Sequence, residues 1–132
     1  EMGIGAGLVD VGGCIRAFGQ RSWRIDFRPV CSQGGGTDSP AVPVSLHDGA
    51  IAGLGSMFSH ARLVEMSTGT VRSTAEWQDM NLLVRARSCA LADALSKVAA
   101  LSPASSKKIL AQFGAEAIAL TSAGVQQLNY AS

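Results

Sequence analysis

The sequence predicts an α/β (or α+β) fold, with a small sheet and flanking helices followed by a C-terminal helical unit. Residues 22–30 alternate apolar and polar side chains, which is typical of a half-buried strand. Residues 45–59 instead carry apolar side chains at helical spacing, and so do most residues from 88 to 128. We therefore divide the chain into a small α/β domain over 1–86 and a helical module over 87–132.

The bulk composition fits a chain that builds a core and carries little net charge. Its 132 residues are 47% hydrophobic and 16% charged, and the formal net charge is +1. That length suits one ordinary domain, or one domain with a small appended module, and the apolar content is too high for a disordered chain. A strongly basic nucleic-acid binder would carry more positive charge, so broad electrostatic capture of DNA or RNA is not indicated.

The N-terminal part combines strand patterns with glycine-rich turns. Residues 8–18 fit either two short strands or a strand joined to a helical turn, and two consecutive glycines indicate a bend. The strand at 22–30 should end near Pro29, because proline cannot donate to a sheet ladder. Residues 32–43 contain three glycines and two prolines, which predicts a flexible loop without a phosphate-binding motif.

The middle of the chain is predicted to hold two helices and one more strand. A helix over 45–59 begins with a Ser-x-x-Asp sequence that resembles a capping box. Residues 61–66 form a short apolar run that suits a strand, and 67–74 read as a turn. A second helix is expected over 75–86, where serine or threonine precedes an apolar stripe.

The C-terminal module is predicted to be entirely helical. Helices are expected over 88–98 and 105–113, joined by a hairpin at 99–104. Gly114 should end the second of them, because glycine just past the last apolar position is a common C-terminal stop. A further helix is expected over 115–128, with a break in its middle.

The stretch from 95 to 128 resembles a helix-hairpin-helix module of DNA repair and recombination proteins. It has an apolar helix end, a hairpin, a helix that begins with lysines, and an Ile-Leu pair before Phe-Gly. A short alanine-rich segment and a closing leucine follow. The matching positions are Val98, Leu101, Lys107, Lys108, Ile109, Leu110, Phe113, Gly114, Ala117, Ile118, Leu120 and Leu128.

The hairpin of this chain departs from the family pattern. In the family, hairpin glycines beside a helix N-terminus present backbone N–H groups to a DNA phosphate. Here the sequence is Ser-Pro-Ala-Ser, so the glycine geometry is lost and Pro103 removes one N–H group. The lysine pair that follows either reaches a phosphate or forms a solvated helix face. The candidate nucleic-acid contacts are Lys97, Ser102, Ser105, Lys107 and Lys108.

Hairpins without glycines occur in the non-catalytic partners of the XPF-type structure-specific nuclease family. The predicted order of strands and helices over 22–86 is similar to the later part of that family's nuclease-fold domain, but the ERKxxxD signature is absent. The resemblance therefore implies a non-catalytic subunit of a DNA repair or meiotic recombination complex. It would form a heterodimer with an XPF-like protein, contact branched DNA and work in the nucleus. The candidate partner interface is Leu95, Val98, Leu101, Ile109, Leu110, Phe113, Ile118 and Leu128.

Two other functions stay open at this point. One is a small structural or interaction subunit of a large assembly, without nucleic-acid binding, and the near-neutral charge fits it equally well. In that case the hairpin-like pattern is simply a helical bundle, because leucine and alanine at helical spacing are common in bundle cores. An enzyme would use Cys31 or Cys89 as nucleophile and His47 or His60 as base, which is a weak signal without local context. We predict that the chain is not an enzyme.

The placement of the cations separates DNA contact from the assembly role. Cations that gather on one face would favour DNA contact, whereas scattered cations would favour the assembly subunit. The cations in question are Arg85, Arg87, Lys97, Lys107 and Lys108.

The cysteines predict an intracellular, reducing compartment rather than a metal site. Cys14, Cys31 and Cys89 are widely spaced, no CxxC pair is present, and the two histidines are not placed to complete a zinc site. We expect buried or half-buried thiols, with no metal and no cofactor. No apolar run approaches the roughly 20 residues of a membrane span, and the apolar opening of the chain lacks the basic start of a signal peptide.

Overall fold

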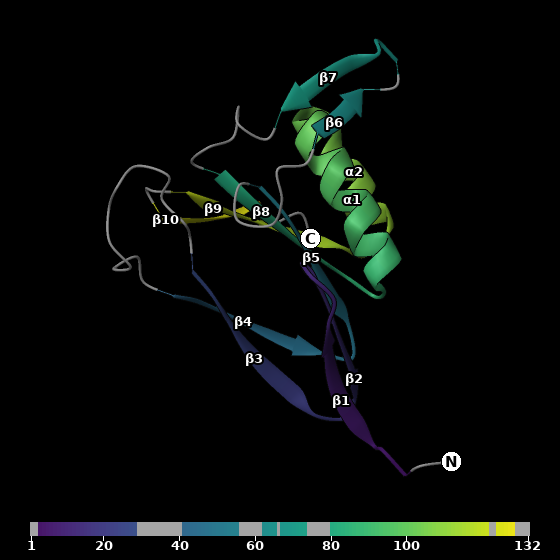
Figure 1. Cartoon of the computed structure of the whole chain (residues 1–132), viewed down its shortest axis with the longest axis vertical. Helices are drawn as coiled ribbons and strands as arrows, with labels where there is room; N and C mark the ends of the chain where they lie inside the picture. The colour runs from purple at the N-terminus through teal and green to yellow at the C-terminus, as the bar shows by residue number, and fades with distance from the viewer. Residues whose placement is uncertain are drawn as a thin grey trace.

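A six-stranded antiparallel sheet is the centre of the protein. The computed structural model describes residues 3–28, 41–55, 62–65, 67–73, 80–121 and 124–128. The strand order is β1-β2-β5-β8-β9-β10, and two further hairpins, β3–β4 and β6–β7, lie outside this sheet (Figure 1). The elements are β1 (Ala6–Asp10), β2 (Cys14–Gly19), β3 (Ser22–Phe27), β4 (Val42–His47), β5 (Ala50–Leu54), β6 (Arg62–Glu65), β7 (Thr70–Ser73), β8 (Met80–Ala86), α1 (Cys89–Leu101), α2 (Pro103–Gln112), β9 (Glu116–Thr121) and β10 (Gly124–Leu128).

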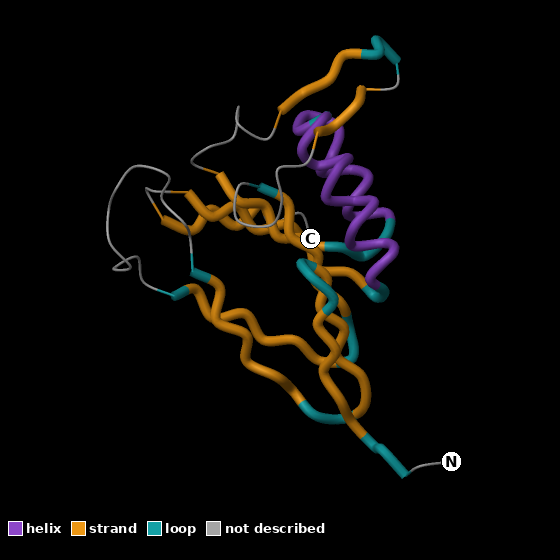
Figure 2. Tube along the Cα trace, viewed as in Figure 1, coloured by secondary structure: helices purple, strands orange, loops and turns teal. Residues whose placement is uncertain are grey.

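The two helices cover one face of the sheet, and the β3–β4 hairpin covers the other (Figure 2). On the helical face, Leu82 and Val84 of β8 pack with Leu95 of α1 and Leu110 of α2. On the opposite face, Leu83 of β8 packs with a cluster that contains residues of the hairpin. Successive residues of a strand point to opposite faces, so β8 supplies apolar side chains to both cores at once. The architecture is therefore three layers: helices, sheet and hairpin.

The first strands form as their alternating pattern predicts. β3 confirms the expected strand in the described part of 22–30, and β6 confirms the strand expected within 61–66. Of the two alternatives for 8–18, the structure has two strands: β1 and β2 pair as an antiparallel hairpin around the glycine bend. Part of the expected loop at 32–43 lies outside the described residues, while Val42 and Pro43 belong to β4.

Both helices expected before residue 87 are wrong in the described residues. Within 45–59, the structure has the end of β4, a tight turn, and β5. Within 75–86, it has β8, which pairs with β5 and β9. In the described part of the expected turn 67–74, residues 67–69 are turn and residues 70–73 form β7. Both β5 and β8 are buried on two faces, and this burial replaces the alternation that would reveal a half-exposed strand.

The C-terminal module is partly helical and partly sheet, so the all-helical prediction is wrong. Helix α1 confirms the helix expected at 88–98, and Ser88 caps it by accepting a hydrogen bond from the backbone N–H of Leu91. Helix α2 confirms the helix expected at 105–113. Gly114 stops α2 as predicted, with a positive φ of 61° and a hydrogen bond from Ala115 N–H to Leu110 O.

Residues 116–121 and 124–128 form the β9–β10 hairpin instead of the expected helix. This hairpin extends the same sheet to which the N-terminal strands belong. The fold class is therefore a sheet-dominated α+β structure, not a small sheet followed by a helix-hairpin-helix unit.

Candidate functional site

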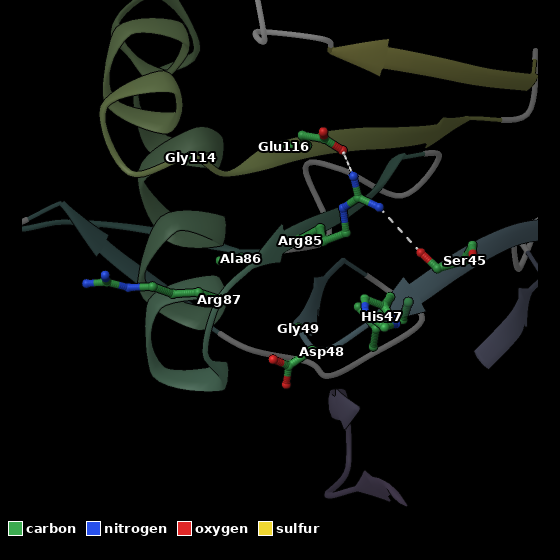
Figure 3. A pocket seen from close by; sticks show the side chains of 10 residues that line it. Ser45, His47, Asp48, Gly49, Arg85, Ala86, Arg87, Gly114 and Glu116 are labelled. Atoms are coloured by element: carbon green, nitrogen blue, oxygen red, sulfur yellow. Dashed lines mark hydrogen bonds and ion pairs between the residues drawn. The ribbon is translucent and has the colours of Figure 1, made fainter. Parts of the chain in front are cut away.

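A pocket of about 420 Å³ lies where the turn between β4 and β5 meets the end of β8 and the start of β9 (Figure 3). Its size falls within the range of small-molecule sites. The polar side chains that line it come from three segments that are far apart in the sequence. The lining residues are Ser45, Leu46, His47, Asp48, Gly49, Arg85, Ala86, Arg87, Gly114 and Glu116.

Arg85 is held between two oxygen atoms at this pocket. It is the register partner of Glu116 across β8 and β9, and its Nη2 lies 2.5 Å from Glu116 Oε2. Its Nη1 donates a longer hydrogen bond of 3.4 Å to the carbonyl oxygen of Ser45 on β4 (Figure 3). Both charged side chains remain about two fifths exposed, so water and a ligand can reach the pair. A guanidinium carries five N–H donors, and these two contacts leave donors available for a ligand.

The floor of the pocket is the tight turn formed by Asp48 and Gly49. Asp48 has a positive φ of 36°, a conformation in which Asp is enriched among non-glycine residues. Arg16 of β2 fixes the turn: its Nη2 donates to Asp48 Oδ1 at 2.9 Å, and its Nη1 donates to Gly49 O at 2.8 Å. The backbone N–H of Ala17 also donates to Gly49 O at 2.9 Å. The turn is therefore tied to the sheet before any ligand binds.

His47 and Arg87 supply the remaining titratable or cationic groups near the pocket. His47 is the last residue of β4 and is exposed. Arg87 is exposed and extends away from the guanidinium of Arg85 (Figure 3). Arg85 is thus the cation that the backbone directs at the pocket. The two ring nitrogens of His47 can form hydrogen bonds with a ligand.

The predicted nucleic-acid contacts do not meet at this pocket. Ser102 and Ser105 are exposed at the junction of α1 and α2, where the amide of Ser105 donates to Ser102 O. Lys97 forms an i,i+4 ion pair with Asp93 on α1. Lys107 and Lys108 are exposed on α2.

The five cations do not share one face. The side chain of Arg85 reaches toward β4 on the hairpin side of the sheet, whereas the three lysines lie on the helices that cover the opposite side. Arg85 and the three lysines therefore do not form the single cationic face that would have favoured DNA contact.

The predicted partner interface divides between core and surface. Leu95 and Leu110 are buried in the core between helices and sheet, where Leu101 and Ile109 pack at the margin. Val98 is half-buried, and Ile118 packs partly buried against the hairpin-side core. Phe113 is exposed by 46%. Leu128 belongs to β10, and its side chain lies outside the described part of the structure.

The residues proposed for an enzyme are not brought together in the described part of the chain. Cys31 and His60 lie outside the described residues. Cys89 begins α1, whereas His47 ends β4. Among the residues that the structure describes, no group of three or more His, Cys, Asp or Glu could hold a metal ion, and no helix is long and apolar enough to span a membrane.

The sequence analysis named Arg85 and Arg87 as cations that could contact DNA, and His47 as a possible base, but it did not predict a site that these residues share. One signal pointed to the turn: Asp-Gly after an alternating Val-x-Val-x-Leu segment is typical of a strand followed by a tight turn. The pairing of Arg85 with Glu116 could not be foreseen, because it depends on the register between two strands that are separated by both helices.

Comparison with known proteins corrects the predicted family. No protein-family model and no curated protein matches this sequence. Among solved structures, the chain is similar to an ApbE protein from Thermotoga maritima, with a TM-score of 0.57 and 20% identity. The alignment covers 92% of this chain and 42% of that one, so this chain spans about two fifths of the length of its structural neighbour.

At this identity the likeness concerns the fold alone. The resemblance to a helix-hairpin-helix module is wrong, because the neighbour is an ApbE protein and residues 116–128 form strands rather than the helix that completes such a module. The description of the chain as a helix-hairpin-helix DNA-repair protein is wrong for the same reason.

Proposed function

We propose that this chain is a non-catalytic binding domain for small anionic molecules that carry a carboxylate or phosphate group. The observation that supports this most is Arg85, an accessible guanidinium held by Glu116 and the Ser45 carbonyl at the edge of a pocket. Arginine binds carboxylates and phosphates through paired N–H donors, and Glu116 already occupies one such position. A ligand anion would add to this contact or displace Glu116.

Two features support a pocket that is already ordered before a ligand binds. The Asp48–Gly49 turn is fixed to β2 by Arg16, so the pocket floor does not have to be ordered on binding. Burial of Gly49 against Ala86 brings this turn close to the end of β8, where a Cβ on Gly49 would lie 3.4 Å from Ala86 O. Preformed sites lose less entropy on binding, which favours affinity for a small ligand.

The direct test is calorimetric titration with two probes, inorganic pyrophosphate and citrate, at low ionic strength. We expect Arg85→Gln to weaken binding about tenfold or more, as for loss of a charged hydrogen bond. Lys108→Gln, an equal charge change on α2, should leave the affinity nearly unchanged. Failure of both probes to bind the unaltered chain would contradict the proposal. So would an equal loss from both variants, because that would indicate diffuse attraction rather than a site.

A second candidate function is that of an interaction subunit, and a different surface favours it. Strand β1 is an edge strand of the main sheet, and the segment around it exposes Ile4, Leu8, Val9 and Val11 at 64%, 38%, 49% and 72%. Edge strands with exposed apolar side chains are templates for pairing with another chain. We propose a second copy of this chain as the occupant.

The charge pattern of β1 is compatible with that self-pairing. Its one charged residue is Asp10. In an antiparallel pairing centred on Leu8, Asp10 would stand opposite Ala6 of the second copy, so no like charges would meet. Light scattering across a concentration series should show a dimer that Val9→Lys dissociates, while Val71→Lys on the β6–β7 hairpin leaves it intact. A monomer at every concentration would exclude this second function.

A further inference from the structure

A second pocket, of about 250 Å³, lies between the β3–β4 hairpin and the main sheet. Figure 2 shows that the hairpin diverges from β1 and β2 beyond the turn that joins β2 to β3. None of the residues that line this pocket lines the pocket of Arg85. The side chains that line it are those of Asp10, Ile15, Ile25, Asp26, Phe27 and Ile51.

The walls of this second pocket are apolar. Ile51 of β5 and Phe27 of β3 belong to the hairpin-side core, and they are 2% and 6% exposed. Ile15 and Ile25 pack against the same core but are only partly buried. The pocket is therefore an opening at the edge of the core. A ligand with an apolar body would remove the exposed parts of these side chains from water, which favours binding.

The register of three strands places a carboxylate beside these apolar walls. Asp10 of β1 lies opposite Ile15 of β2, and Ile15 lies opposite Ile51 of β5. Residues directly opposite each other in a ladder share a face of the sheet, so the three side chains form one row. Because Ile51 belongs to the hairpin-side core, Asp10 faces the hairpin as well. The exposed carboxylate of Asp10 thus stands at the rim of the pocket.

The two carboxylates of this pocket differ in their partners. Asp26 accepts a hydrogen bond of 3.0 Å from Nε of Arg24, its neighbour on the same strand. Among the described residues, no cation forms an ion pair with Asp10. Asp10 is therefore the carboxylate that a ligand cation would meet.

We propose that this pocket binds a small organic cation, an ammonium group attached to one aromatic ring or a short alkyl chain. The ammonium group would contact the carboxylate of Asp10, and the apolar body would cover Ile15, Ile25 and Phe27. The size limits the ligand, because about 250 Å³ is less than the roughly 300–1,000 Å³ of sites for drug-sized molecules. This inference goes beyond the proposed anion site, from which it differs in place and in the sign of the ligand's charge.

The carboxylate of Asp10 decides which apolar molecules the pocket accepts. A bound ligand takes water away from this carboxylate, and a buried charge is costly unless an opposite charge or a hydrogen-bond donor replaces the water. An ammonium group supplies both. A hydroxyl group supplies a donor without a charge, and a carboxylate on the ligand would be repelled. The expected order of affinity is therefore amine, alcohol, carboxylate for ligands with the same body.

The test compares 2-phenylethylamine, 2-phenylethanol and phenylacetate, which share a phenyl group and differ in charge. Each is titrated to millimolar concentration against the unaltered chain, and binding is followed by the amide shifts in heteronuclear NMR spectra. The amine should bind most tightly and shift the amides of Ile15, Phe27 and Ile51. Equal affinity for the amine and phenylacetate, or no shift at these three amides, would overturn the proposal. A pyrophosphate titration of the same sample reports on the Arg85 pocket separately.

A charge variant at the rim tests the role of Asp10. Asp10→Asn keeps the shape of the side chain and should weaken binding of the amine severalfold, while the affinity for 2-phenylethanol stays nearly the same. Asp93→Asn is the matched control, since it removes the same charge on α1, on the other side of the sheet. An equal loss of amine affinity in both variants would indicate diffuse attraction and overturn the proposal. The three-ligand comparison on the unaltered chain remains decisive if Asp10→Asn folds poorly.

Discussion

Arg85 and Glu116 face each other across β8 and β9, with Nη2 of the arginine 2.5 Å from Oε2 of the glutamate. The pair is accessible to water, so its contribution to folding should be small, about 1 kcal/mol or less. Under the proposed function its consequence for binding is larger, because the carboxylate and an anionic ligand would compete for the same guanidinium. The strength of this ion pair in the unliganded protein should therefore affect how tightly an anion binds.

Glu116→Gln should tighten anion binding severalfold, because it removes the competing charge while keeping a side chain of similar size. Titration with pyrophosphate measures the effect, and urea unfolding should show a change within about 1 kcal/mol. Asp26→Asn is a matched control, since it removes the acid of another exposed pair, with Arg24 on β3. Weaker binding by Glu116→Gln would mean that Glu116 positions Arg85 instead of competing with the ligand.

Gly19 should tolerate alanine much less well than Gly12. Both have positive φ, 84° and 54°, so alanine costs about 1–2 kcal/mol at either position. A Cβ on Gly19 would also lie 2.1 Å from Gly5 O and 2.7 Å from the Cα of Ala6, whereas a Cβ on Gly12 meets nothing within 4 Å.

We therefore expect Gly19→Ala to reduce the free energy of unfolding by roughly 1–3 kcal/mol more than Gly12→Ala does, because backbone must move to relieve the overlap. Urea denaturation with both variants measures this difference. Equal costs would show that the end of β2 relaxes freely away from β1.

Strands β8 and β9 were not recognised from the sequence because each is buried on both of its faces. In β9, Ala117 faces the helical core while Ile118 and Leu120 face the hairpin-side core. The result is a continuous apolar run, which periodicity alone cannot distinguish from a buried helix. Leu82 and Leu83 of β8 give the same ambiguity. By contrast, β3 has exposed polar positions between its apolar ones and was predicted correctly.

The helices were predictable because their ends carry local signals. Ser88 stands before α1 and Gly114 follows α2, and each acts through its neighbouring backbone. The candidate site had no comparable local signal. It depends on cross-strand register and on a turn that joins the hairpin layer to the sheet, and both are set by tertiary packing.

Leu110 tests whether the predicted interface residues serve the chain's own core. Its side chain is fully buried in α2 against the sheet. Leu110→Ala should therefore destabilise the chain by about 2–5 kcal/mol, through lost apolar contact and the cavity that remains. Lys108→Ala on the exposed side of α2 should change stability by no more than about 0.5 kcal/mol. A cost for Leu110→Ala near that of the control would mean that α2 does not pack firmly on the sheet.

The raised pKa of Cys14 predicts a loss of stability at alkaline pH. The thiol has a pKa of 9.0 as a model group and about 12 in the fold, with burial as the first cause. Between these values the unfolded chain releases the proton and the folded chain keeps it. The contribution is therefore fully present below pH 9 and is lost as pH rises toward 12.

Urea unfolding under a reductant at several pH values between 8 and 11 should show this dependence. The stability of the unaltered chain should fall more steeply than that of Cys14→Ala, where this proton is missing. The stability of Cys89→Ala should fall with an intermediate slope, because the change removes the effect of Cys89 on the pKa of Cys14 but leaves Cys14 partly buried. Parallel curves for the unaltered chain and Cys14→Ala would show that Cys14 ionises equally in both states, and that its surroundings in the fold do not raise its pKa.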